Sequence, residues 1–552
     1  MKKLIGNIRS RTRLLRLIPV GFASLWCALP VFAASSASQH GITWTFSSDR
    51  TVGQYANGDW WVVGPVTITS ISPNSVTDGS GWTKNGTMVN PPVGTAQGFD
   101  SSIQTYAQWN SALNVSPGFK GSPLSVPVGS SVVSAISNST AGDAATRPQL
   151  WDGAVLTVVA SAPSAGAFRP PIMGTDKTHY WNKSNLNYGI LQKLAPVAST
   201  PLLSTVEGYF ERPWFAQMEG SAARYIAPSN SMPEYGRDQA QRLSLGLLSL
   251  HLNYTNAQKE KLYVRLVQYG IDLYGSVRSG TVFVDNGGLN AGRKAPLVLA
   301  GLALNDANIL QWADAAQHFV FQEDRQTWFV TQSDVGRAVL QEATKPRETY
   351  LQSHVGMPEW GEKHTSQPVR DDSRWGPAFY RWIGGTWMGN VLMAHLTTGG
   401  VQAWNHQPLF AYSDRYWELE KNSQTFSAPN DISPFVYQMW AAYRGASPAT
   451  IPPVTIPPPP PAVTFAIGNR IETSKNTNVR VSGSLTGTLL GVQSQGSLGT
   501  IVGGSVQMDN ITWWQVNYDN GADGWSGGDN FIKSTNLSTP PPSAPTGLKV
   551  VE

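Results

Sequence analysis

One proline-rich stretch excludes both helix and sheet and so divides this chain. Residues 447–463 read SPATIPPVTIPPPPPAV, in which eight of seventeen residues are proline. Proline lacks the backbone N–H that helices and sheets require, and repeated proline favours an extended polyproline II conformation. We therefore expect residues 447–463 to form a semi-rigid linker between a large N-terminal part and a small C-terminal part.

The first half of the N-terminal part has the pattern of short strands. Residues 40–170 are poor in charge and rich in Gly, Ser, Thr, Val and Pro. WWVVGPVTITSI alternates like a strand after the turn residues Asn57-Gly58-Asp59, and GSSVVSAIS and AVLTVVA read as further strands. Short strands between turn residues predict a β-sandwich-like domain over residues 40–170.

The pattern then changes to a helical period. Within residues 175–446, GRDQAQRLSLGLLSLHLN is apolar nearly all round, which is typical of a buried helix. The next segment begins with the capping residues Thr255 and Asn256 and stops at Gly280. At least six such segments, the last closing near Gly445, predict an (α/α) toroid, with a simple helical bundle as the alternative.

The first 33 residues have the three parts of a secretory signal peptide. Six Lys and Arg residues precede an apolar stretch from Leu17 to Phe32, which ends in small residues up to Ala33. The apolar stretch is short for a membrane span, so we expect cleavage and a secreted protein, with an uncleaved anchor as the alternative. We expect no membrane association after cleavage.

Removal of this segment changes the charge and the cysteine count. Lys and Arg fall from 40 to 34 against 36 Asp and Glu, so the formal net charge changes from +4 to −2. The mature protein would have no basic field suited to nucleic acid. The single cysteine, Cys27, leaves with the signal segment, which excludes disulfides and thiolate metal sites.

The segment after the linker resembles a known family. Asn478-Val479-Arg480, Trp513-Trp514-Gln515-Val516 and Gly524-Trp525 are similar to the bacterial SH3-like (SH3b) family over residues 464–534. The resemblance implies a small β-barrel, often an accessory module that contacts cell wall or polymer, and implies no catalysis. Residues 535–552 look like a linker and the start of a fibronectin type III domain, so we expect a disordered tail or a truncated end.

Polar and aromatic residues gather at predicted helix starts and loops of residues 175–446, which suits a sugar polymer. Aromatic rings such as Trp214 pack against the C–H faces of pyranose rings, and carboxylates, amides and guanidinium groups pair with the hydroxyls. The layout resembles secreted polysaccharide lyases of the (α/α)-toroid plus β-sandwich kind. We expect the chain to cleave a uronic-acid polysaccharide by β-elimination, with no cofactor.

Elimination needs a group that neutralises the C6 carboxylate, a base for the C5 proton and an acid for the leaving oxygen. We assign catalysis to a set of residues that offers these groups: His354, Tyr235, Arg237 and Asn290. We assign substrate binding to their neighbours: Arg293, Glu359, His364, Trp360, Asp238 and Trp214. This hypothesis requires loops far apart in the chain to converge on one groove.

Three other interpretations stay open. A glycoside hydrolase would use two carboxyl groups flanking the scissile bond, with candidates Asp238, Asp285, Glu211 and Glu359. A secreted adhesin or cell-wall binding protein would bind glycan without cleaving it. His354, Glu359 and His364 could also ligate a metal, but the histidines are ten residues apart with Pro358 between them, so we assign no metal site.

Overall fold

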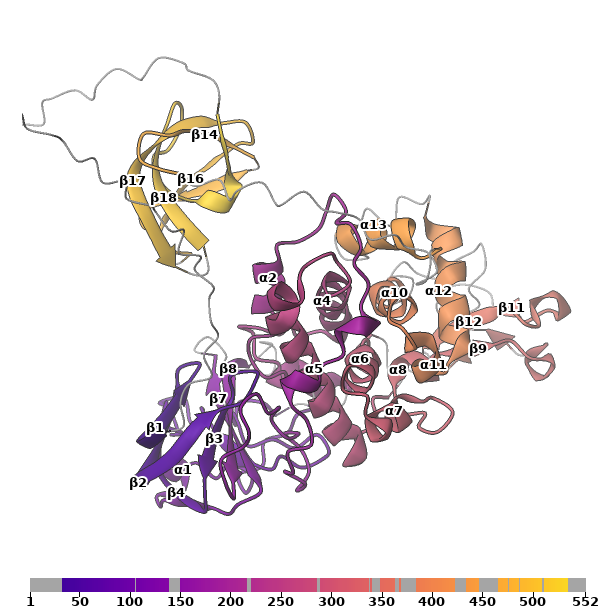
Figure 1. Cartoon of the computed structure of the whole chain (residues 1–552), viewed down its shortest axis with the longest axis horizontal. Helices are drawn as coiled ribbons and strands as arrows, with labels where there is room; N and C mark the ends of the chain where they lie inside the picture. The colour runs from indigo at the N-terminus through magenta and orange to yellow at the C-terminus, as the bar shows by residue number, and fades with distance from the viewer. Residues whose placement is uncertain are drawn as a thin grey trace, which may run out of the picture. The chain divides into compact units, whose positions relative to one another are not determined.

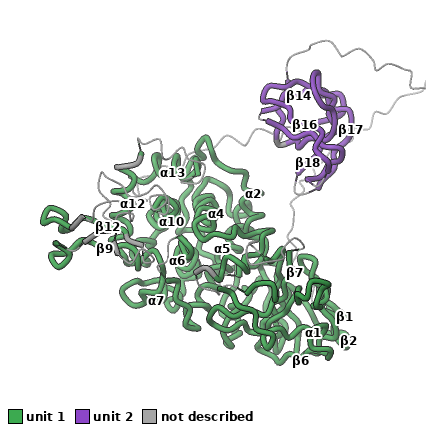
Figure 2. The backbone as a smooth tube through the Cα atoms, turned by 180° about the vertical axis from the view of Figure 1, so that it is seen from behind, with its two compact units in different colours: residues 1–454 green, residues 455–552 purple. Residues whose placement is uncertain are grey.

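The computed structural model divides the chain into two compact units, residues 1–454 and 455–552 (Figure 2). The residues that the structure describes are 32–104, 106–138, 149–215, 220–284, 288–336, 338–339, 348–362, 367–368, 384–421, 433–445, 465–474, 476–485, 487–508 and 511–534. The expected signal segment lies almost wholly outside them, and the expected linker entirely so. The boundary between the units falls within that linker.

A curled half-barrel sheet forms the first part of the larger unit (Figure 1). Its eight strands are β1 (Phe32–Gln39), β2 (Ile42–Gln54), β3 (Trp60–Val63), β4 (Val66–Ser72), β5 (Thr87–Val89), β6 (Leu124–Val126), β7 (Ser130–Ser137) and β8 (Leu150–Val159). Their order is β5-β7-β8-β3-β2-β4-β6, with β1 paired to β2. A strand-rich region is confirmed, but its described strands belong to one curled sheet rather than to two stacked sheets.

Both faces of the curled sheet are covered by apolar side chains. On β7, Val132 belongs to the core inside the curl, while its neighbour Val133 belongs to a second core on the opposite face. Strand β8 alternates in the same way, with Leu156 inside and Val155 outside. The outer core includes Phe215 and Ile226, which lie beyond the sheet in sequence, so this face of the sheet packs against the start of the helical region.

The middle region is helical, as the period predicts. Its longer helices are α4 (Gly236–Ser249), α5 (Asn256–Arg278), α6 (Lys294–Leu304), α10 (Met388–Leu396), α12 (Gln407–Glu420) and α13 (Pro434–Tyr443). The shorter helices of the unit are α1 (Pro117–Lys120), α2 (Leu203–Gly208), α3 (Gly220–Ile226), α7 (Ala307–Ala313), α8 (Gln322–Arg325) and α11 (Gly400–Trp404). Helix α10 packs against α4 and α6, and α5 packs against α6.

Helix α5 has the ends that its sequence predicts. The Thr255 hydroxyl accepts the backbone N–H of Gln258, and the Gln258 side chain accepts the backbone N–H of Thr255, which completes a capping box. Gly280 follows the helix with a φ of 105°, a conformation that favours glycine. Seventeen residues of α5 are buried, so it is the central helix of the unit.

A small β-arm interrupts the helical region, where the sequence predicts only loops. It contains β9 (Thr327–Phe329), β10 (Ala338–Val339), β11 (Glu348–Thr349), β12 (Pro358–Glu362) and β13 (Gln367–Pro368). Strand β12 pairs with β9, so that Glu359 lies opposite Trp328. Pro358 ends any helix, as predicted, but it also opens a strand, because a first strand position needs no N–H donor.

The C-terminal unit is a seven-stranded sheet with its own core. Its strands are β14 (Arg470–Thr473), β15 (Thr477–Arg480), β16 (Leu489–Gln493), β17 (Leu498–Met508), β18 (Ile511–Tyr518), β19 (Gly524–Gly527) and β20 (Phe531–Lys533). Ile471, Val479, Ile501 and Val516 are fully buried at its centre. In the described part of the chain, no helix has both the length and the apolar character needed to cross a membrane.

Candidate functional site

A small pocket lies where the curled sheet meets the helical region. Its wall comes from four parts of the chain: the turn between β2 and β3, the segment that follows β8, the segment between α2 and α3, and helix α5. The residues that line it are Asn57, Arg169, Phe210, Glu211, Arg212, Pro213, Trp214, Arg265, Gln268, Tyr269 and Asp272. Segments more than two hundred residues apart in sequence therefore contribute to one concave site.

Aromatic side chains form one wall of the pocket. The Trp214 ring lies 5.2 Å from the Phe210 ring in a stacked arrangement and 5.0 Å from the tilted Tyr269 ring, measured between centroids. The Trp214 indole N–H donates to the Tyr209 carbonyl at 2.9 Å, which fixes the ring. Trp214 is the one residue of the predicted substrate-binding set that lines this pocket, and its side chain is 2% exposed and belongs to the main helical core.

Arginine side chains also line the pocket. Arg212 donates through Nε to both carboxylate oxygens of Asp152, at 3.0 and 2.9 Å. Arg265 donates through Nη1 to the Glu207 carbonyl at 2.9 Å, and its Nη2 lies 3.9 Å from the Glu211 carboxylate. The Arg265 Nε is buried without a hydrogen-bond partner among the described residues. Three arginines against Glu211 and Asp272 give the lining a formal charge of +1.

Tyr269 belongs to the pocket lining and carries a buried hydroxyl. Its side chain is buried on α5, and its hydroxyl forms no hydrogen bond within the described ranges. Burial raises the pKa of Tyr269 to about 12, while the nearby Arg293 charge acts to lower it. The phenol therefore stays protonated at neutral pH and has a proton to donate.

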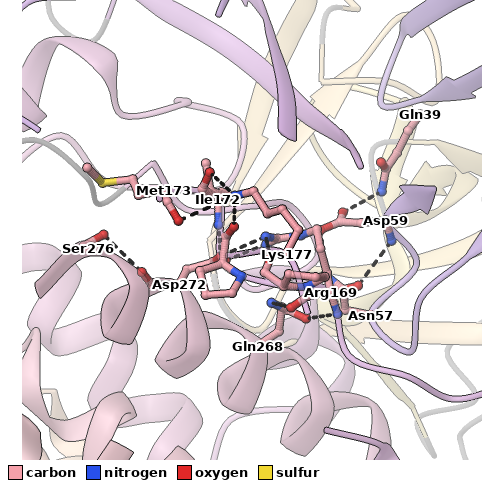
Figure 3. Close-up of polar contacts among 12 residues, drawn as sticks. Gln39, Asn57, Asp59, Arg169, Ile172, Met173, Lys177, Gln268, Asp272 and Ser276 are labelled. Atoms are coloured by element: carbon pink, nitrogen blue, oxygen red, sulfur yellow. Dashed lines mark hydrogen bonds and ion pairs between the residues drawn. The ribbon is translucent and has the colours of Figure 1, made fainter. Parts of the chain in front are cut away.

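A buried ion-pair network holds the floor of the pocket (Figure 3). Arg169 donates through Nε to Asp59 at 2.6 Å, and through Nη1 and Nη2 to the two carboxylate oxygens of Asp272 at 2.8 and 2.5 Å. Gln268 adds a pair of bonds with the backbone of Arg169, at 2.9 and 3.0 Å. The network joins the β2–β3 turn to helix α5 and fixes the two sides of the pocket relative to each other.

Lys177 stabilises the segment beside this network. Its ammonium group is buried and donates to the carbonyls of Pro171, Ile172 and Met173. Figure 3 shows these bonds next to Asp272, whose carboxylate also accepts the Ile172 N–H at 3.0 Å. The loop is thereby tied to α5 through polar contacts, and the Pro171 ring also packs closely against Gly275 of the helix.

Four of the sequence-predicted site residues lie around the start of α4. Tyr235 precedes the helix, and its ring lies under the guanidinium groups of Arg224 and Arg237, at 5.0 and 5.4 Å. Arg237 also pairs with Asp238 at 3.0 Å. The Tyr235 hydroxyl accepts the Gly288 N–H at 3.4 Å, so the loop that carries Asn290 lies beside it. This juxtaposition is part of what the sequence hypothesis requires.

A glycine at the start of α4 permits the close approach of these two loops. A Cβ atom on Gly236 would lie 2.0 Å from the Leu289 carbonyl oxygen. The neighbouring Asn290 is fully buried, and its amide donates to the Val284 carbonyl at 2.9 Å. Its backbone N–H donates to Gln322 at 2.7 Å. These bonds indicate that Asn290 orders its own loop.

His354 lies on the β-arm instead. Its Nδ1 accepts the Leu351 N–H at 3.0 Å, and its ring meets the Tyr350 ring edge-on at 6.3 Å. In Figure 1, β11 and β12, which flank His354 in sequence, lie on the side of the larger unit that is away from α4. His354 is not among the residues that line the pocket.

The other predicted residues of the arm are buried in its base. Glu359 is fully buried and lies 3.8 Å from Arg415 on α12, and Trp360 belongs to the main helical core. These contacts favour a structural role for both. His364 and Asp285 lie outside the described residues. Within the described ranges, no group of three His, Cys, Asp or Glu side chains is placed to hold a metal ion.

Arg293, predicted to bind substrate, is buried immediately before α6. Its side chain is fully buried, and none of its three guanidinium nitrogens forms a hydrogen bond among the described residues. The next residue, Lys294, is also fully buried but pairs with Asp324 at 2.6 Å. Arg293 therefore differs from the other buried cations near it, because its charge has no hydrogen-bonded partner.

Sequence reasoning missed most of the pocket lining, although one signal was present. Helix α5 is buried almost all round, yet Arg265, Gln268 and Asp272 recur on it at intervals of three and four residues. Polar residues at that spacing share one face of a helix. A polar stripe on a buried helix indicates either a network of paired polar groups or a binding site. Here the stripe contributes both to the Arg169 network and to the pocket lining.

Comparison with known proteins supplies no relative. The chain matches no protein-family model, no curated protein and no solved structure. The functional argument therefore depends on the geometry of the pocket.

Proposed function

We propose that this chain is a secreted polysaccharide lyase that cleaves a uronic-acid-containing glycan by β-elimination in the pocket beside α5. One observation carries the proposal: Tyr269, whose buried hydroxyl has no hydrogen-bond partner among the described residues, contributes to the same pocket as Trp214 and Arg265. An aromatic face, a cation and a protonated phenol are the groups that binding and cleaving an acidic sugar require.

Each step of the elimination has a candidate group on the lining. Arg265 binds the C6 carboxylate and stabilises the negative charge that develops as the C5–H bond breaks. The Glu211 carboxylate takes that proton. The electron pair forms the C4–C5 double bond, the C4–O bond breaks, and Tyr269 protonates the leaving oxygen. Arg212 lies 3.6 Å from Glu211 and helps to position it.

The hydrolase alternative is less well supported by this pocket. A glycoside hydrolase needs two carboxyl groups available to the scissile bond. Glu211 and Asp272 are the only carboxylates on the described lining, and Asp272 is held by both terminal nitrogens of Arg169. A non-catalytic glycan-binding protein remains the second alternative, and it needs no proton donor in the site.

The proposal includes the finer features of the architecture. The packing of α10 against α4 and α6, and of α5 against α6, supports an (α/α)-toroid type of catalytic domain. The small seven-stranded sheet supports an SH3-like accessory module that contacts cell wall or polymer. The basic, then apolar, N-terminal sequence supports export through a cleaved signal peptide.

A polysaccharide panel tests the proposed function. The purified chain is incubated with uronic-acid polymers and with neutral polymers, and both ultraviolet absorbance and reducing ends are measured. The lyase predicts absorbance from the new C4–C5 double bond, conjugated with the carboxylate, on a uronic-acid polymer only. Reducing ends without absorbance would establish the hydrolase instead, and retention on the polymer without either product would establish the binding protein.

A further inference from the structure

Four buried polar side chains behind the pocket lack the partners that burial normally demands. They are Tyr269 on α5, Arg293 before α6, Glu323 on α8 and Asn390 on α10, and we call them the inner polar cluster. Arg293, Glu323 and Asn390 are fully buried, and Tyr269 is 4% exposed. Within the described ranges, the Tyr269 hydroxyl, all three Arg293 nitrogens, the Glu323 Oε2 atom and both Asn390 amide atoms form no hydrogen bond.

Several observations place these groups near one another. The charges of Arg293 and Glu323 both act on the Tyr269 hydroxyl. Gly292, the neighbour of Arg293, has a φ of 81°, and a Cβ atom there would lie 3.0 Å from the Asn390 Nδ2 atom. The Glu323 Oε1 atom lies 3.5 Å from the Lys294 N–H at the start of α6. The cluster therefore surrounds the N-terminal end of α6.

Unpaired buried groups of this kind are costly to keep. A buried guanidinium without a partner loses its hydrogen bonds to water and forms no others in their place. Native proteins therefore pair such groups with an acceptor or a carboxylate, or bind an anion to them. The neighbouring cations are paired, because Lys294 bonds Asp324 and Arg169 bonds Asp59 and Asp272. Among these three cations, only Arg293 has no hydrogen-bonded carboxylate within the described residues.

We propose that the inner polar cluster is an internal binding site for a single carboxylate group. The planar guanidinium of Arg293 presents parallel N–H donors that match a carboxylate, and the Asn390 amide and Tyr269 hydroxyl supply further donors. The positive end of the α6 dipole favours an anion at the same place. Because only one charge is uncompensated, the site suits a monoanion better than a dianion such as sulfate.

Glu323 is compatible with such an anion. Burial raises the pKa of Glu323 to about 7, so its carboxyl group is largely protonated in mildly acidic solution and can itself donate a hydrogen bond. Tyr269 belongs to both the pocket lining and the cluster, which makes it the link between them. The site stands independently of the proposed elimination, and the ligand is either a free small carboxylate or the carboxylate of a uronic acid.

Thermal unfolding of the full chain tests this site. The midpoint is measured in sodium acetate, sodium glucuronate, sodium sulfate and sodium chloride at equal ionic strength and mildly acidic pH. The proposal predicts that acetate raises the midpoint above its value in chloride, with sulfate resembling chloride. A further rise with glucuronate identifies a uronic acid as the ligand, and acetate alone identifies a free small carboxylate.

Variants assign the effect to the cluster. Arg293→Met should remove the acetate shift and leave the acetate-free midpoint unchanged or higher, because it deletes an unpaired charge. Arg293→Lys keeps the charge but loses the planar fork, so titration calorimetry should show acetate binding at least about tenfold weaker. Asn390→Leu should also weaken binding. Arg278→Met, at an exposed arginine paired with Asp176, is the matched control and should keep the full shift.

Three results would overturn the proposal. They are equal midpoints of the wild-type chain in acetate and chloride, an acetate shift that survives in both Arg293 variants, and a folded Arg293→Met variant with a sharply lower acetate-free midpoint. The outcome is separable from the proposed function. Acetate binding without polysaccharide cleavage would support the internal carboxylate site and contradict the lyase function. Cleavage without acetate binding would support the lyase function and contradict the internal site.

Discussion

Arg169 and Asp272 join through two parallel hydrogen bonds, from Nη1 at 2.8 Å and Nη2 at 2.5 Å, in a place where Arg169 is fully buried. Arg169 comes from the segment after the curled sheet, and Asp272 comes from the middle of α5. The same guanidinium also holds Asp59 of the β2–β3 turn. This bridge sets the distance between the two sides of the pocket, so its loss should affect both stability and function.

We expect Asp272→Asn to lower the free energy of unfolding by about 3 kcal/mol, because it leaves a buried guanidinium with half of its charge compensation. Denaturant unfolding measures this change. Asp414→Asn is the matched control, since Asp414 forms an equivalent two-bond pair with Arg444 but is about half exposed. Removal of that pair should cost about 1 kcal/mol or less. Equal costs for both variants would contradict the argument from burial.

Tyr269→Phe tests the proton donor of the proposed elimination. The hydroxyl has no hydrogen-bond partner in the described part of the chain, so its removal should leave the thermal midpoint nearly unchanged. Turnover of the uronic-acid polymer should fall about 10²- to 10⁴-fold, as expected for the loss of a general acid. A variant that keeps its stability and also keeps its turnover would exclude Tyr269 from the chemistry.

His354→Ala separates the pocket from the interpretation that the sequence alone suggests. His354 lies on the β-arm and does not line the pocket, so we expect the variant to keep its turnover within about twofold of wild type. If His354 were the general base, its removal would lower turnover at least about a hundredfold. Steady-state kinetics on the polymer identified by the panel measures the ratio. A loss of turnover as deep as that of Tyr269→Phe would restore the sequence-based assignment of His354.

The ends of the long helices can be predicted from the sequence, whereas the pocket cannot. The capping pair Thr255 and Gln258 and the stop at Gly280 act over a few residues, so the ends of α5 could be read directly. Strand β12 could not be predicted in this way, because its five residues include Pro358 and show no clear alternation of apolar and polar side chains. Whether a helix forms depends mainly on residues near one another in sequence. Whether a short strand forms depends on a partner strand far away in sequence, which for β12 is β9.

The pocket depends even more on distant partners. Asn57, Arg169, Trp214 and Tyr269 meet only after the sheet and the helices have packed, and no spacing in the sequence encodes that meeting. The sequence singles out Trp214 because an aromatic residue among charged ones suggests a sugar site, and that role stays a prediction. Tyr269 was missed because an aromatic residue on an apolar helix is indistinguishable from core until its hydroxyl is seen to lack a partner.

Glu323 gives stability a defined pH dependence. Burial raises its pKa from an ordinary value of 4.5 to about 7, so between these values the folded chain binds a proton that the unfolded chain has released. The free energy of unfolding therefore falls as pH rises from about 4.5 to about 7. Glu323→Gln mimics the protonated form and should flatten this part of the profile, measured as the difference from wild type. Parallel profiles for the two proteins would contradict the assignment.

The separation into two units predicts independent behaviour of the C-terminal sheet. A chain that ends at residue 454 should unfold at the same midpoint as the larger unit of the full chain, and residues 455–552 should fold alone, because each unit has its own core. Calorimetry of the full chain should show two transitions that match those of the separate pieces. The shortened chain should keep its turnover of soluble polymer but bind insoluble cell-wall material more weakly, because a tethered second module raises the effective concentration of the first at a surface. A lowered midpoint in the shortened chain would show that the C-terminal sheet stabilises the larger unit.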